Sequence, residues 1–108
     1  MTLHIAAEEL LQELARMEST MVAVARQAGT GQNPELERQL DTHLRALRVL
    51  LDANGVAVAE DTVEAAKRVL DSAEPDAPLM MLRMARDSLA AVVRRQAARS
   101  DAWAARAA

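Results

Sequence analysis

The two histidines of this chain are the side chains best suited to proton transfer, because imidazole titrates near neutral pH. His43 falls on the leucine face of a predicted helix, close to Leu40 and Leu47. We expect it to be an edge histidine that hydrogen-bonds a neighbouring helix or water. A buried pH-sensitive switch or a ligand contact is the alternative. His4 is expected to lie at the surface, near the beginning of the chain.

Enzyme motifs are missing around these histidines. Di-metal helical bundles carry Glu-x-x-His pairs, but the residues three positions before the two histidines are Met1 and Leu40. The chain has no cysteine, and its glycines Gly29 and Gly31 do not follow a predicted strand as those of a phosphate-binding loop would. Four serines lie outside any nucleophile motif: Ser19, Ser72, Ser88 and Ser100. We therefore predict a non-enzymatic protein without catalytic residues, metal or cofactor.

The predicted helix over residues 78–104 carries side chains suited to binding. Its core face is leucine- and valine-rich, and a second apolar line runs along the opposite side. Methionine adapts to irregular partner surfaces, tryptophan is enriched at binding hot spots, and arginines can form a polar rim. The predicted partner-binding residues are Met80, Met84, Ala91, Arg94, Arg95, Ala98, Arg99 and Trp103.

These residues also allow plainer interpretations. Met80 and Met84 could cover the turn between Pro75 and Pro78, and the alanines could serve only as good helix formers. Trp103 could cover the end of the bundle with its N–H at the rim.

Charge is unevenly distributed along the chain, which has a formal net charge of −3. Residues 1–82 contain 7 basic and 14 acidic side chains, whereas residues 83–108 contain six arginines and two aspartates. The basic end suggests a nucleic-acid-associated regulator as the alternative function. We prefer self-complementary electrostatics, because the protein is acidic overall and Trp103 is its only aromatic residue for base stacking.

The main structural signal is a heptad stripe near the beginning of the chain. Its members are separated by alternating steps of four and three, which predicts a helix over residues 3–28. They are Leu3, Ala7, Leu10, Leu14, Met17, Met21, Val24 and Ala28. Further helices are predicted over residues 34–54, with Asn33 as its cap, and over residues 61–73, with Asp61 as its cap. Asn54-Gly55 is predicted to end the second helix.

Short connections between amphipathic helices favour antiparallel neighbours. We therefore predict one all-α domain over residues 1–108, an antiparallel four-helix bundle with long first and last helices and shorter second and third helices. Its core must consist of Leu, Val, Met and Ala. Neither a membrane-spanning run nor a secretion signal is evident, so we expect a cytoplasmic protein. Twelve arginines against one lysine suggest a high-GC bacterial or phage-like origin.

The leucine-rich helices, the Gly55-Val56 turn and the polar C-terminal helix are similar in general plan to the small helical export chaperones of flagellar and type III secretion systems. That resemblance implies a helical bundle that binds other proteins. We expect a small protein–protein interaction module, namely an adaptor, a chaperone or an assembly factor. Its partner would be another protein or a second copy of the chain, with a homodimer as the simplest case.

Overall fold

The computed structural model describes the backbone of residues 2–107 and the side chains of residues 6–103, 105 and 106. This range contains four helices and no strand, which confirms the predicted all-helical bundle. The helices are α1 (Thr2–Arg26), α2 (Pro34–Leu50), α3 (Ala53–Asp71) and α4 (Asp76–Ala107). The predicted surface position of His4 and the first stripe member, Leu3, concern side chains outside the described ones.

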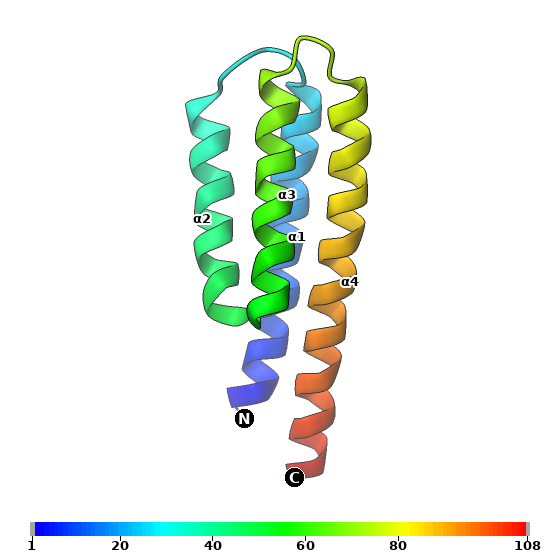
Figure 1. Ribbon diagram of the computed structural model, residues 1–108. Helices are drawn as coiled ribbons and strands as arrows, with labels where there is room; N and C mark the ends of the chain where they lie inside the picture. Colours follow the sequence, from blue (N-terminus) through cyan, green and yellow to red (C-terminus); the bar gives the residue numbers. More distant parts are fainter. Residues whose placement is uncertain (1, 108) are drawn as a thin grey trace.

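The helices lie side by side in an elongated bundle of 53 × 22 × 20 Å, and the chain turns back at each connection (Figure 1). α1 and α3 each contact the other three helices, whereas α2 and α4 lie diagonally opposite and are joined by the hydrogen bond from Gln96 to Leu50. The two ends of the chain lie at the same end of the bundle (Figure 1). There α1 and α4 continue past the connection between α2 and α3.

The heptad stripe of α1 lies in the core, as predicted. Its members from Ala7 to Val24 are all buried, and Ala28 packs against the core from the loop that follows. Leucines of α2 and small residues of α3 and α4, such as Ala59, Ala66 and Ala90, complete this core. Small side chains allow helices to approach closely, so a core with no phenylalanine or tyrosine can still be well filled.

The predicted boundary between the second and third helices is wrong. α2 ends at Leu50 rather than residue 54, and α3 begins at Ala53 rather than residue 61. Asp52 is the N-cap, because its side chain accepts a hydrogen bond from the backbone N–H of Gly55 at 2.9 Å, and Asp61 is inside the helix. Gly55 therefore belongs to a first helical turn instead of a left-handed cap. A Cβ at this position would lie 3.1 Å from atoms of Leu51 and Val92, so glycine permits the close approach.

The outer helices also differ from their predicted bounds. α1 ends at Arg26 rather than residue 28, and α4 extends from Asp76 to Ala107 rather than from 78 to 104. The N–H of Leu79 donates to the carbonyl of Pro75 at 2.8 Å, which includes Pro78 in the first turn, where a proline needs no hydrogen bond. The predicted cap at Asn33 is confirmed by its bond to the N–H of Leu36.

The loop between α1 and α2 closes the end of α3. Gly29 and Gly31 have φ angles of +76° and +95°, a conformation that glycine adopts without strain. Their N–H groups donate to the carbonyls of Val69 and Leu70 at 3.0 and 2.9 Å. Carbonyls in the last turn of a helix have no partner within the helix, so this loop satisfies two of them.

At the α2–α3 connection, Gln96 of α4 likewise satisfies backbone groups at helix ends. Its side-chain amide donates to the carbonyl of Leu50 at 2.7 Å and accepts from the N–H of Asp52 at 3.0 Å. One side chain thus joins α4 to the last residue of α2 and to the cap of α3.

Among the helices of residues 2–107, none combines the length and apolar character needed to cross a membrane.

Replacement of Asp52 by alanine is expected to lower the free energy of unfolding by about 1 kcal/mol, because the first turn of α3 loses its side-chain acceptor. Asp61→Ala is the matched control. Asp61 is exposed within the helix, where alanine is favourable, so its effect should stay within about 0.5 kcal/mol. Urea denaturation measures both values. A larger loss for Asp61→Ala would contradict the observed start of α3.

Candidate interaction surface

All eight predicted partner-binding residues lie at the surface of α4. The side chains of Met80 and Met84 are 65% and 66% exposed, so they do not fold back into a covered position over the Pro75–Pro78 turn. Met81 was not among the predicted partner-binding residues, but it is also largely exposed. Its place in the sequence between Met80 and Met84, which were both predicted to be exposed, could have indicated this. Three neighbouring thioethers therefore face solvent near the beginning of α4.

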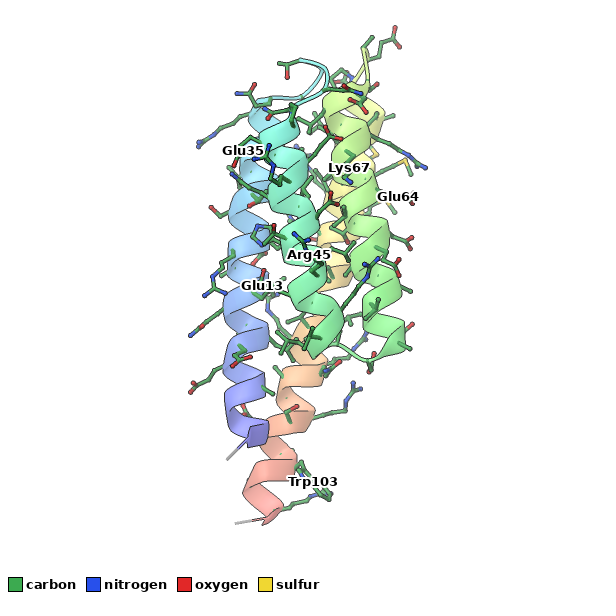
Figure 2. All side chains as sticks on the ribbon, turned by 90° about the vertical axis from the view of Figure 1, so that its left-hand side faces the viewer. Glu13, Glu35, Arg45, Glu64, Lys67 and Trp103 are labelled. Atoms are coloured by element: carbon green, nitrogen blue, oxygen red, sulfur yellow. The ribbon has the colours of Figure 1, made fainter. Side chains whose placement is uncertain are left out.

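Trp103 lies on the part of α4 that extends beyond the α2–α3 connection (Figure 2). It is 60% exposed, and therefore the indole does not serve as a buried cover for the end of the bundle. Trp103 lies seven residues, about two turns, after Gln96. It is therefore on the same side of α4 as Gln96, the side that faces the other helices before the α2–α3 connection. Beyond the connection, α2 and α3 no longer cover this side.

The arginines of α4 divide into two groups. Arg99 pairs with the α3 cap Asp52 at 3.2 Å, so it contributes to the fold. Arg94 and Arg95 are exposed and form no ion pair with any described residue. The predicted polar rim therefore contains two unpaired guanidinium groups and one that is already bound within the chain.

A groove of about 350 Å³ lies between α1 and α4, beside the predicted surface. Its floor is apolar, and three arginines and one glutamate lie among its lining residues. These are Glu18, Met21, Val22, Ala25, Arg26, Leu79, Leu82, Arg83 and Arg86. The α1 side of this groove was not predicted from the sequence, although Val22 lies outside the buried stripe as an exposed apolar residue.

His43 belongs to a hydrogen-bonded cluster between α1 and α2. Its Nδ1 lies 2.8 Å from Oε1 of Glu13, and its Nε2 lies 2.8 Å from Oγ1 of Thr20. The carboxylate of Glu13 also accepts a bond from Arg16 at 3.0 Å. Because a carboxylate only accepts, the neutral imidazole carries its proton on Nδ1 and accepts the Thr20 hydroxyl at Nε2. Glu13 lies at the α2 side of α1 (Figure 2).

This cluster explains the position of His43 among leucines. The side chains of His43 and Glu13 are only 13% and 9% exposed, and each has a polar partner. Within the described residues, no buried side-chain nitrogen or oxygen lacks a hydrogen bond. The prediction of an edge histidine bonded to a neighbouring helix thus agrees with these contacts. Its partners were not visible in the sequence, because Glu13 and Thr20 occupy positions beside the heptad stripe.

When a carboxylate, an imidazole and a hydroxyl are hydrogen-bonded in this order, the imidazole can take the proton of the hydroxyl and make its oxygen a nucleophile. A groove of about 370 Å³ adjoins Thr20 and His43, and the residues that line it all have polar or charged side chains. However, Thr20 itself is buried, and it lies inside α1, where backbone N–H groups bond within the helix. Donors for a developing oxyanion would have to come from side chains such as Arg16 and Arg38, which already pair with Glu13 and Glu35.

Two further comparisons concern possible ligands and relatives. In the described part of the chain, no group of three or more His, Cys, Asp or Glu side chains is arranged to hold a metal ion. Comparison with protein-family models, with curated proteins and with solved structures found no match to this chain. Function must therefore be argued from the chain's own residues.

Replacement of Glu13 by alanine is expected to lower the free energy of unfolding by about 2 kcal/mol, since it leaves the Nδ1–H of His43 without an acceptor. Thr20→Val keeps the shape of the side chain but removes its hydroxyl, and should cost about 1 kcal/mol. The exposed neighbour Ser19 provides the control, because Ser19→Ala removes a hydroxyl that takes no part in the cluster. Equal stability of all three variants in urea denaturation would show that the cluster contributes nothing.

Proposed function

We propose that this protein is a non-enzymatic interaction module, an adaptor, chaperone or assembly factor, that binds a protein partner or a second copy of itself through α4. One observation carries the proposal. Among the described residues, seven large hydrophobic side chains are exposed, and four of them belong to α4. They are Met80, Met81, Met84 and Trp103. A cluster of exposed apolar side chains with charged neighbours, such as the three methionines form, is typical of an interaction site.

The chemistry of these side chains supports the proposal. Methionine is flexible and polarisable, so a methionine cluster can adapt to an irregular partner surface. Tryptophan and arginine are the residues that most often dominate binding energies. Trp103, Arg94 and Arg95 follow the methionines along the same helix, although they do not all lie on one face. The C-terminal half of α4 thus offers a partner both an apolar anchor and charged contacts.

A homodimer is the simplest form of the proposal. A self-complementary apolar patch most often closes into a two-fold pair. The charge distribution supports such pairing, because the basic residues 83–108 can face the acidic surface of residues 1–82 in a second copy. The scaffold in this proposal is an antiparallel bundle with long first and last helices, and the last helix carries the contact. We place it in the cytoplasm, since a chain without cysteine needs no oxidising compartment.

The Glu13–His43–Thr20 cluster supports the non-enzymatic part of the proposal. Its groups satisfy one another's hydrogen-bonding capacity, and its hydroxyl lies in a buried position. Such a cluster stabilises one arrangement of two helices. The two arginines of the adjoining groove, Arg16 and Arg38, are already paired with Glu13 and Glu35.

A nucleic-acid-associated regulator is the second candidate function. What favours it is the pair of exposed arginines, Arg94 and Arg95, which lack an acidic partner among the described residues. On a helix, however, two adjacent residues point in directions about 100° apart, so they do not form a continuous stripe for a phosphate backbone. Arg99 is paired with Asp52. The protein-binding proposal therefore has the stronger support.

Met84→Asp is expected to abolish self-association, because a carboxylate would be buried in an apolar contact. Light scattering over a range of protein concentrations measures the mass in solution. Val49→Asp is the matched control, since Val49 is 84% exposed on α2, away from the proposed contact. We expect a dimer for the native chain and for Val49→Asp, and a monomer for Met84→Asp. A native chain that stays monomeric at every concentration contradicts the homodimer form.

Fluorescence titration with duplex and single-stranded oligonucleotides at low salt tests the second candidate. We expect no salt-sensitive binding, because the net charge of −3 repels phosphate and the arginines form no continuous surface. If binding does occur and weakens steeply with salt, Arg94→Ala/Arg95→Ala should reduce it. That result would favour the nucleic-acid function over the protein-binding one.

A further inference from the structure

The groove between α1 and α4 has an apolar floor. Met21 and Leu82 are buried at its base, and Leu79 is partly buried beside them. Val22 of α1 is 49% exposed at the same site, so a large aliphatic side chain faces solvent. A volume of about 350 Å³ is enough to receive a few side chains of another protein.

An exposed apolar stripe on α1 continues the groove along the bundle. Leu11, Ala15, Val22 and Ala25 are all exposed, and Glu18 occupies the place between Ala15 and Val22. These positions follow steps of four, three, four and three, the same spacing as the buried stripe on the inner side of the helix. From residue 11 to residue 25 the stripe is about 21 Å long. Its length and direction suit a partner helix lying along α1.

The groove carries more positive than negative charge among its lining residues. Arg26 and Arg83 line it and form no ion pair with any described residue, and Arg86 reaches only its exposed neighbour Asp87, at 3.5 Å. Glu18 is the one acidic residue in the lining. Guanidinium groups bind carboxylates in bidentate geometry, so this lining is complementary to acidic side chains.

We propose that the seam between α1 and α4 binds an amphipathic helix of a partner protein, whose apolar stripe is flanked by aspartate or glutamate. The apolar face of that helix lies on Val22 and Leu79, and its carboxylates pair with Arg26 and Arg83. This proposal rests on the proposed function and specifies its partner. Helix-in-groove recognition of this kind uses apolar anchors at successive turns of the bound helix.

Two designed peptides of about 20 residues, long enough to cover the stripe, test the proposal. Both carry leucine at heptad positions. The acidic probe has glutamate at the flanking positions, and the basic probe has lysine there. Fluorescence anisotropy measures the binding of each to the full chain. We expect the acidic probe to bind at least about ten-fold more tightly, and the difference to shrink at about 0.5 M salt.

Variants of the protein locate the binding site. Val22→Asp and the double variant Arg26→Glu/Arg83→Glu should each lower the affinity for the acidic probe by about ten-fold or more. Val49→Asp is the control, because it places the same charge at an exposed valine of α2. All substituted side chains are exposed, so circular dichroism should show native helix content and melting for each variant.

The contrary outcomes distinguish this proposal from the proposed function. If the acidic probe fails to bind, or if both probes bind equally, the proposal that the groove binds an acidic helix is overturned. Loss of binding in Met84→Asp but not in Val22→Asp also overturns it, while leaving α4 as an interaction surface. If the native chain is a dimer that Val22→Asp dissociates, a second copy occupies the groove and the proposed acidic helix is wrong.

Discussion

The whole fold depends on burying the inner stripe of α1. Leu10, Met17 and Val24 of this stripe are fully buried, and α1 contacts all three other helices. Burial of such side chains contributes roughly 1.5–3 kcal/mol each before the entropy of folding is subtracted. The remaining helices are best understood as the surfaces that cover this stripe.

An aliphatic stripe alone does not fix how the helices are positioned along one another. Leucines can exchange places at little cost when one helix slides by a turn, whereas directional hydrogen bonds cannot. Several polar contacts join the elements of this bundle, and three of them involve partly buried groups or helix ends. His43 joins α2 to Glu13 and Thr20 of α1, Gln96 joins α4 to the α2–α3 connection, and the α1–α2 loop closes the end of α3. Each contact also satisfies groups that would be costly to bury unpaired.

The sequence allowed the helices and the core to be predicted where a pattern repeats. The stripe of α1 and the leucines of α2 repeat over several turns, so their burial followed from spacing alone. The start of α3 did not, because Asp52 and Asp61 are both acceptable caps and only packing distinguishes them. Gly55 fits closely against Leu51 and Val92, and this tight fit belongs to the three-dimensional structure.

The candidate site was predictable to a similar degree. The exposed face of α4 followed from its second apolar line, since a helix that packs on one side leaves the opposite side free. The partners of His43 did not follow, because Glu13 is 30 residues away in the chain and belongs to another helix. The α1 side of the groove was missed for the same reason. A surface shared by two helices appears only when both are placed together.

The two stripes of α1 differ in a way that bears on binding. The inner stripe consists mainly of leucine and methionine, whereas two of the four apolar residues on the outer stripe are alanine. Because hydrophobic free energy scales with the apolar area that is buried, the outer stripe contributes less to any contact. A partner held by this stripe alone would bind weakly and with little selectivity. In the proposed complex, Arg26 and Arg83, which form no ion pair with the described residues, provide what the alanines lack, since charge complementarity selects a partner and orients it.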